Sequence, residues 1–585
     1  MRVSDYIANV LESEGIHTLF SITGGFAMHL NDSFGNNKAL HVYYNHHEQS
    51  CGYAAVGYSK TNYKPSAVCT TAGAATTNCV TPCLIAYQDS VPVMFLSGQV
   101  KTNDSIRSIH SNRDSALRNY AFADCDIISI VSPITKYSHE LRSVSEVKEV
   151  MQRAIYNLKH GRPGPVWISV PLDIQGAQIN DAFVAPVYKS PQYTTVPNEI
   201  YSLFQESTRP IILAGNGINL ANCRDAFTKF VETYKIPVVT TLLGMDVIET
   251  DSRYFAGRVG SYGDRYGNFS IQNSDLVIVL GSSLSSSVVG YKPEWFAREA
   301  KILYVDIDQS ELSKPTVQTI PIHMDLNSFF SSFAMEAKDY SNWITKCNHW
   351  KQKWMFEMPN YTNESINPYP ALKVIFDMLP ENKTVVSMTG SIATLVWHMN
   401  KIKKNDKFIF NGQGDMGPDT PASIGAYIAD PAKPVFNIVG EGALQFNIQE
   451  LQTIVHHKMP IKTIVFNNAS YGAIEITQRA NFKNLYGLNA DSGISFPDTE
   501  KIANAYGIHY IGVRTLEDLS NAIREMIEYS GPVMLEIFCC VQGRYPKLSA
   551  RKLPDGSFTS LPFEDMEPFL DRNEFYGEMI IKPLS

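Results

Sequence analysis

Two short motifs, each at the end of an apolar run, have the residue types to hold a metal ion together. Gly440-Glu441-Gly442 follows residues 435–439, and Asn467-Asn468 follows residues 461–466. In a βαβ unit both strands end at the carboxyl edge of the sheet, where ligands bind. We therefore expect Glu441 and Asn468 to face each other. Carboxylate, amide and carbonyl oxygens suit Mg²⁺ holding a phosphate, rather than zinc or copper. A glycine turn followed by an ordinary loop is the alternative.

The segment between these motifs predicts a helix. Asn447 and Glu450 have the spacing of a capping pair. The apolar face of this helix consists of Ile448, Leu451, Ile454 and Val455. The glycines around Glu441 and the N-terminus of such a helix would let backbone N–H groups approach a phosphate.

This arrangement resembles the diphosphate–Mg²⁺ motif of thiamine-diphosphate-dependent enzymes, which reads Gly-Asp-Gly, a helix and Asn-Asn. The resemblance implies metal binding by the side chains of Glu441 and Asn468 and by the backbone carbonyl of Ser470. Glu441 stands where the family usually has aspartate, and its extra methylene must shift the backbone or the metal. Further cofactor contacts are implied at Gly442, Ala443 and Ile474.

A second segment, residues 411–425, resembles the part of the family that wraps the cofactor between its two rings. Met416 would be the apolar wedge between those rings. Main-chain groups of Gly414 and Met416 would bond the aminopyrimidine. Gly390 and Ser391, after their own strand, would touch the diphosphate. A glycine turn with a core methionine is the alternative.

A third segment, residues 44–58, resembles the His-Glu-Gln segment of acetolactate-synthase-type enzymes, whose glutamate hydrogen-bonds N1′ of the aminopyrimidine. Glu48 is the matching residue. The thiazolium C2 proton is too weakly acidic to leave unaided. A carboxyl group at N1′ favours the imino tautomer, whose nitrogen takes that proton. An exposed glutamate in the first turn of a helix is the alternative.

Two loops depart from the family pattern. Residues 73–78 keep Thr77 and Asn78, the latter an implied cofactor contact, but lack the usual Pro-Gly. Residues 122–124 read Phe-Ala-Asp where acetolactate synthases read Phe-Gln-Glu. The specificity of those enzymes for pyruvate plus a keto acid therefore does not carry over. The substrate candidates are Gly25, His47, Gln99 and His110. An ordinary polar or core histidine is the alternative for each histidine.

The central segment bears on FAD. Residues 281–287 lack the arginine that often follows Gly-Ser in flavin-binding relatives, although Arg258 and Gly260 remain. The absence of FAD is therefore favoured over its presence.

These candidate residues need elements that bring them together. Short β-branched runs alternate with helical patterns, which predicts an α/β fold with doubly wound parallel sheets. The resemblance, from about residue 3 to residue 540, implies three such domains. These are an aminopyrimidine-binding domain at 1–178, a central domain at 195–335 and a diphosphate- and Mg²⁺-binding domain at 365–545, followed by a tail at 546–585. Residues 176–197 indicate a linker. Residues 335–368, which include Trp343, Trp350 and Trp354, indicate an irregular second connection.

Composition excludes several classes of protein. The chain has 585 residues, a net charge of −8 and no basic block, which argues against a nucleic-acid binder. Its nine cysteines are odd in number and lack a CxxC, which argues against a disulfide framework or a zinc site and favours a reducing compartment. No signal-peptide core and no membrane-length apolar stretch occurs, so we expect a cytoplasmic protein without a membrane partner.

The resemblance implies an enzyme dependent on thiamine diphosphate and Mg²⁺ that decarboxylates a 2-oxo acid, pyruvate foremost. It favours ligation of the product to a second carbonyl compound, either pyruvate or a keto-sugar. A non-ligating decarboxylase and a non-catalytic paralogue are the alternatives. In this family Glu48 and the diphosphate site come from different subunits, which implies a homodimer or homotetramer with active sites at the interface.

Overall fold

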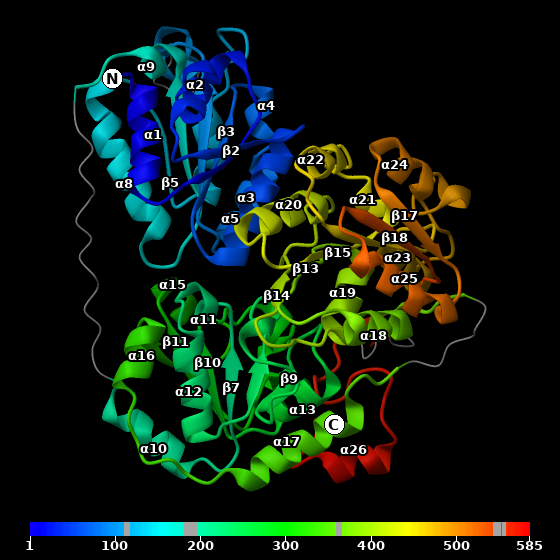
Figure 1. Ribbon diagram of the computed structural model, residues 1–585. Coiled ribbons are helices and arrows are strands. Elements are labelled where there is room, and N and C mark those ends of the chain that lie inside the picture. The colour runs from blue at the N-terminus through cyan, green and yellow to red at the C-terminus, as the bar shows by residue number, and fades with distance from the viewer. Residues whose placement is uncertain (110–116, 181–195, 359–364, 542–550, 553–556, 585) are drawn as a thin grey trace.

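The computed structural model describes residues 1–109, 117–180, 196–358, 365–541, 551–552 and 557–584. Within these ranges, three six-stranded sheets with parallel strand pairs each lie between layers of helices (Figure 1). A two-stranded antiparallel ribbon, β19 (Arg551–Lys552) with β20 (Phe558–Thr559), lies in the tail. The predicted fold class, α/β with three doubly wound parallel sheets, is confirmed.

The first sheet has the strand order β2-β1-β3-β4-β6-β5. Its strands are β1 Thr18–Ser21, β2 His41–Tyr44, β3 Ser66–Thr70, β4 Val93–Gln99, β5 Tyr137–Glu140 and β6 Val166–Pro171. The main helices around it are α1 Val3–Ser13, α2 Met28–Asn36, α3 Glu48–Asn62, α5 Val80–Gln88 and α8 Val147–Lys159. Helix α1 forms because Tyr6, Val10 and Leu11 recur at helical spacing and are buried against this sheet.

The third sheet, β14-β13-β15-β16-β18-β17, has the same strand order as the first when each is counted from its own first strand. Its strands are β13 Thr384–Val386, β14 Lys407–Ile409, β15 Val435–Gly440, β16 Lys462–Asn467, β17 His509–Val513 and β18 Val533–Phe538. Its helices are α18 Pro368–Met378, α19 Gly390–Met399, α20 Asp419–Ala429, α21 Glu441–Leu444, α22 Glu450–His456, α23 Gly472–Asn481, α24 Thr499–Tyr506 and α25 Leu516–Glu528. The first and third domains therefore share one topology.

The central sheet has another order, β12-β11-β10-β7-β8-β9, which is that of dinucleotide-binding domains. Its strands are β7 Pro210–Ala214, β8 Val238–Thr240, β9 Phe255–Arg258, β10 Leu276–Leu280, β11 Lys301–Asp306 and β12 Ile320–His323. The helices beside it include α10 Asn198–Glu206, α12 Arg224–Tyr234, α13 Arg265–Gln272 and α16 Leu326–Ser332.

Helices α3 and α20 join the first and third domains. Each follows the second strand of its own sheet, so they are equivalent elements of the shared topology. Any side chain at Gly57 would overlap the backbone of Ala422, and any side chain at Gly425 would overlap the backbone of Ala54. The two helices therefore pack with their backbones in direct contact, which fixes the two domains against each other.

The second connection differs from its prediction. Residues 335–368 were expected to be irregular, but they contain the 14-residue helix α17, Ser341–Trp354. Trp343, Cys347, Trp350 and Trp354 recur at helical spacing, and all four are buried against the central domain. The prediction was wrong because an aromatic stripe on an otherwise polar segment is itself the pattern of an amphipathic helix.

The described part of the tail returns to the central domain (Figure 1). Its helix α26, Arg572–Glu578, lies beside α17, where Trp350 Nε1 donates to Glu578 Oε2 at 2.9 Å. Phe575 packs edge-on against Phe269 of α13, with ring centroids 6.1 Å apart. The last segment of the chain is thus part of the core of its middle domain.

In the part of the chain that the structure describes, no helix combines the length and the apolar character that crossing a bilayer requires.

Candidate active site

The carboxyl ends of three neighbouring strands of the third sheet carry most of the predicted cofactor and metal residues. Gly390 and Ser391 follow β13, Glu441 directly follows β15, and Asn468 follows β16. Gly472, at the start of α23, faces the same place, because a side chain there would meet Asn468 Nδ2 at 2.9 Å and Ser391 Oγ at 3.1 Å. The sheet order therefore brings residues from distant parts of the sequence to one edge.

Glu441 and Asn468 converge on one backbone group. The N–H of Ser470 donates to Glu441 Oε1 at 2.9 Å and to Asn468 Oδ1 at 3.0 Å. The Glu441 side chain is 3% exposed and, among the described residues, forms no ion pair. Burial raises the pKa of Glu441 to about 7. A buried carboxylate without an ion-pair partner is destabilised in its charged form, and a bound cation would stabilise that form.

Asn447 and Glu450 do not form the predicted capping pair. Residue Gln449 precedes α22 without a side-chain cap, and Asn447 has a positive φ of 63° that breaks the helix. The Glu450 carboxylate instead accepts from Asn45 Nδ2 at 2.9 Å and from the N–H of His46 at 3.0 Å. The prediction was wrong because contacts to the first domain take both side chains away from the helix end.

The loop at residues 411–417 has an open, turned backbone. Gly414 and Gly390 have φ values of 80° and 83°, and a Cβ at either position would meet no atom within 4 Å. Asn411 Oδ1 accepts from the N–H of Gly414 at 3.0 Å and so holds the turn. Met416 is partly exposed at the end of this loop. The loop thus offers main-chain groups and an apolar side chain next to empty space.

Glu48 is the first residue of α3, and its carboxylate accepts from Asn78 Nδ2 at 3.0 Å. The structure therefore brings together these two predicted residues. In contrast, α3 contacts the third domain of its own chain through other residues. The α3 residues that make hydrogen bonds or close backbone contacts with it are Gln49, Ser50, Tyr53, Gly57 and Lys60, and His46 just before the helix does so as well. No hydrogen bond joins Glu48 to the third domain within the described ranges.

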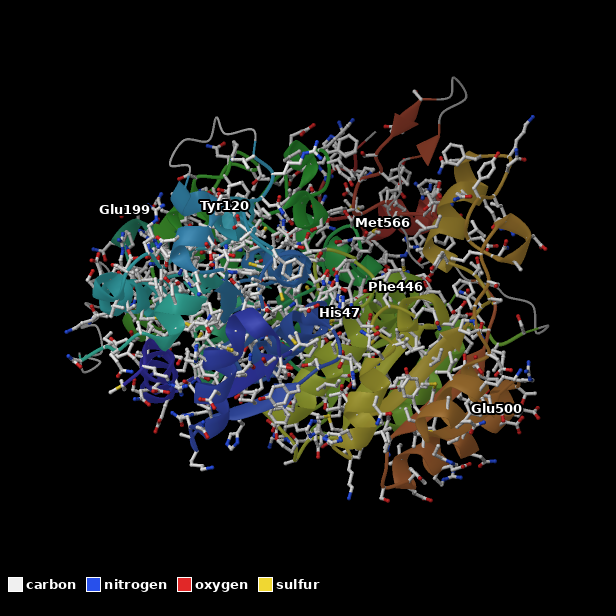
Figure 2. The ribbon with its side chains drawn as sticks, turned by 90° about the horizontal axis from the view of Figure 1, so that it is seen from above. His47, Tyr120, Glu199, Phe446, Glu500 and Met566 are labelled. Carbon is white, nitrogen blue, oxygen red and sulfur yellow. The ribbon has the colours of Figure 1, made fainter. Side chains whose placement is uncertain are left out.

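The substrate candidates separate into different environments. His47 directly precedes Glu48 and is labelled near the middle of the molecule in Figure 2, and its buried Nδ1 has no partner among the described residues. Gly25 is exposed at the loop after β1. The Gln99 amide is buried and donates to Cys125 O at 2.7 Å and to Glu140 Oε2 at 3.1 Å, so it is engaged inside the first domain. His110 lies outside the described residues.

The two loops that depart from the family pattern touch each other. A side chain at Gly73 would meet the carbonyl oxygen of Ala123 at 2.8 Å, and Ala123 has a positive φ of 64°. Next to it, Phe122 is 87% exposed and its ring lies 6.4 Å from that of Phe26. The two altered loops therefore meet, and Phe122 with Phe26 forms an exposed apolar patch next to them.

A cavity of about 870 Å³ lies where the three domains meet. The ends of β7, β10 and β11 line it together with Lys136 and Arg162 of the first domain and Gly412 of the third. Arg258, which the sequence analysis considered in connection with FAD, does not line this cavity. It is buried and donates to Asn400 Oδ1 at 2.7 Å and to the Asn400 carbonyl at 3.0 Å. Arg258 thus serves a contact between the central and third domains.

The residues present fit thiamine diphosphate with Mg²⁺. The candidate metal ligands are one carboxylate, one amide and a carbonyl, and no group of three or more His, Cys, Asp or Glu side chains suited to a metal occurs in the described ranges. Such an oxygen set suits a hard ion that retains phosphate oxygens as ligands. The uncompensated Glu441 and the open backbone at Gly390 and Gly414 agree with a bound group at this edge.

The sequence analysis assigned no functional role to three residues that connect the first and third domains near this site. Tyr53 and Asp415 form a hydrogen bond between the first and third domains, and Asn447 connects α3 to the loop at 411–417. Two signals in the sequence point to Asp415 and Tyr53. Asp415 is a charged residue inside a glycine-rich loop, and Tyr53 is a large residue inside a run of small ones.

Comparison with known proteins gives one consistent result. Three family models match: "Thiamine pyrophosphate enzyme, N-terminal TPP binding domain" at residues 1–118, the central domain at 198–333 and the C-terminal TPP binding domain at 388–537. A probable acetolactate synthase large subunit of Methanocaldococcus jannaschii is 30% identical over 562 residues, covering 92% of each chain. The acetolactate synthase large subunit of Lactococcus lactis is 30% identical, covering 91% of this chain and 92% of its own. Acetolactate synthase isozyme 2 of Escherichia coli is 27% identical, covering 92% and 95%.

Proposed function

Because this chain belongs to the thiamine pyrophosphate enzymes, with acetolactate synthase large subunits among its relatives, we propose that it decarboxylates a 2-oxo acid, pyruvate foremost, and joins the remaining acyl unit to a second carbonyl compound. The family makes the chain an enzyme dependent on thiamine diphosphate, with Mg²⁺ as the usual partner of that cofactor. The observation that carries the site assignment is the buried Glu441, which meets Asn468 at the N–H of Ser470 without a cation partner in the described ranges.

Bound thiamine diphosphate would supply a thiazolium ring that accepts the electrons left behind when CO₂ departs. The chain's own residues would hold it in place. Glu441, Asn468 and the carbonyl of Ser470 would bind the metal, and Gly390, Ser391, Gly442 and Ala443 would border the diphosphate. Ile474, which is half exposed on α23, would lie at the outer side of this site.

Proton transfer is assigned to Glu48. Its carboxyl group would hold a proton at N1′ of the aminopyrimidine, with Asn78 orienting that carboxyl group through the 3.0 Å hydrogen bond. Met416 and the main chain of Gly414 would fix the ring. His47, with its free Nδ1, is the best-placed substrate candidate of those described.

Ligation competes with simple release of an aldehyde. The acetolactate synthase relatives support ligation, that is, attack on a second carbonyl compound rather than protonation. The decarboxylase alternative predicts an aldehyde from pyruvate, whereas ligation predicts a hydroxyketone.

The direct test is a titration with thiamine diphosphate, with and without Mg²⁺, followed by mass-spectrometric identification of products from a panel of 2-oxo acids and keto-sugars. We expect Mg²⁺-dependent binding and a ligated product. Absence of binding at millimolar cofactor would refute the proposed function. An aldehyde as the only product would instead support the decarboxylase.

We also propose that two copies build each active site. The support is the position of Glu48, which is not among the α3 residues that contact the third domain of its own chain. A partner's third domain would complete the site. Co-expression of Glu48→Gln with Glu441→Ala would test this, because a mixed dimer then holds one intact site. Random mixing predicts about a quarter of normal activity, whereas sites built within one chain predict none.

A further inference from the structure

We propose that Tyr53 and Asp415 are a positioning pair that sets the place of Met416 in the cofactor site. This inference rests on the proposed function, because it concerns how the chain holds the loop around the aminopyrimidine. Both residues lie in segments that carry the resemblance, but the resemblance assigns no role to either of them.

The pair is a short hydrogen bond between two domains. The Tyr53 hydroxyl donates to Asp415 Oδ2 at 2.6 Å, and Asn411 Nδ2 donates to Asp415 Oδ1 at 2.7 Å. The backbone carbonyl of Asp415 also accepts from the hydroxyl of Thr389. Both carboxylate oxygens and the carbonyl are therefore engaged, from three different elements. The residue immediately before Met416 has little freedom to move.

The residue immediately after Met416 is held as well. The Gly417 carbonyl accepts from Asn447 Nδ2 at 3.1 Å, and Asn447 Oδ1 accepts from Ser50 Oγ at 2.9 Å. A side chain at Gly417 would meet Phe446 Cβ at 2.8 Å, so the backbone also packs closely there. Ser50 and Tyr53 both belong to α3. One rigid helix therefore fixes the loop on both sides of Met416.

The Tyr53 side chain can act only as a donor in this place. It is fully buried, and burial together with the neighbouring Asp415 carboxylate raises the pKa of the phenol well above its usual value. Its loss would leave one carboxylate oxygen of the half-buried Asp415 without its protein partner. The loop would then shift to recover a partner, and Met416 would move with it.

The test uses Tyr53→Phe, which removes one hydroxyl, and Asp415→Asn, which leaves a single acceptor oxygen for two donors. Tyr137→Phe on β5, at the far edge of the first sheet, is the matched control. We expect each of the first two variants to weaken thiamine diphosphate binding about tenfold and to lower kcat at saturating cofactor. The KM for the 2-oxo acid and the thermal midpoint of the apoprotein should stay close to wild type. The control should bind as wild type does.

A double-mutant cycle separates positioning from general destabilisation. If the two residues act as a pair, Tyr53→Phe/Asp415→Asn should bind cofactor no more weakly than either single variant. Wild-type cofactor affinity and kcat in Tyr53→Phe would overturn the inference, as would fully additive losses. Failure of the wild-type protein itself to bind thiamine diphosphate would overturn the proposed function instead. If Tyr53→Phe does not fold, wild-type cofactor affinity in Asp415→Asn alone would be enough to reject the pair.

Discussion

The proposed proton transfer depends on one side chain, the carboxyl group of Glu48. Glu48→Gln keeps an oxygen that can accept from Asn78 Nδ2, so the local hydrogen bond survives. We expect turnover to fall at least about 100-fold, because an amide cannot hold the proton at N1′, while folding and cofactor binding persist. Steady-state kinetics measures the loss of turnover, and a cofactor titration measures binding. Unchanged turnover would exclude the proton-transfer role.

A second residue-scale prediction concerns Asp419 at the start of α20. Burial raises the pKa of Asp419 to about 7, although its Oδ1 accepts from the N–H of Met388 at 2.6 Å. The unfolded chain releases this proton at lower pH than the folded one, from the usual aspartate value near 3.8. Stability should therefore fall as the pH rises from about 4 to about 7 and then level off.

Asp419→Asn should remove this loss, because asparagine does not ionise and its oxygen can still accept from Met388. Above pH 7 we expect the variant to be more stable than wild type by about 1–4 kcal/mol. Denaturant midpoints of the apoprotein at pH 5 and pH 8 would show the two chains diverging. The exposed Asp225→Asn should run parallel to wild type. A parallel course for Asp419→Asn would show that the carboxyl group ionises as easily as in the unfolded chain.

At the scale of elements, the contact of α3 with α20 depends on glycine. Alanine in place of a helical glycine normally stabilises a helix by about 1 kcal/mol. At Gly425 the added methyl would overlap the carbonyl of Ala54, so the two helices must separate. The substitution should therefore destabilise the protein instead of stabilising it. We expect Gly425→Ala to lower the thermal midpoint and weaken cofactor binding.

Gly35 on α2 supplies the matched control, because a Cβ there would meet nothing within 4 Å. Gly35→Ala should raise the thermal midpoint slightly or leave it unchanged. If both alanine variants behaved alike, the helix contact would be looser than the structure shows.

Elements with a strong local pattern could be predicted from the sequence. The apolar run before Glu441 is β15, and the run before Asn468 is β16. Because neighbouring parallel strands end at the same edge of a sheet, the sequence predicts that Glu441 and Asn468 face each other. In the structure both side chains accept from the N–H of Ser470. The break at Asn447 could not be predicted, since it depends on Ser50 and Gln49 of another domain. Helix α17 was predictable from its tryptophan spacing, but its partner α26 lies over 200 residues away in the sequence.

At the scale of the whole molecule, the tail is held by Glu578. Four donors surround its carboxylate, from Lys346, His349, Trp350 and Lys353, at 2.7–3.0 Å. Burial opposes ionisation, but the hydrogen bonds from these donors outweigh it and hold the pKa of Glu578 well below its usual value. This contribution is present above about pH 4.5 and is lost as the pH falls further.

Glu578→Gln should therefore loosen the tail at pH 7, by about 1–3 kcal/mol. Trypsin should cleave the tail faster in the variant than in wild type. The difference should shrink in acid, where the wild-type carboxylate begins to protonate, and a pepsin time course can follow it there. Equal cleavage rates at pH 7 would show that the apolar contacts of Phe575 alone hold the tail.

The return of the tail to the central domain also sets an order of events during synthesis. The central sheet and α17 leave the ribosome about 10 to 50 seconds before α26, at the usual 5–20 residues per second. During that interval Phe269, Trp350 and Trp354 lack the cover that Phe575 provides in the finished chain. The middle domain of the nascent protein therefore exposes an aromatic surface until α26 emerges. A chaperone that binds aromatic segments should therefore find a binding site there during synthesis.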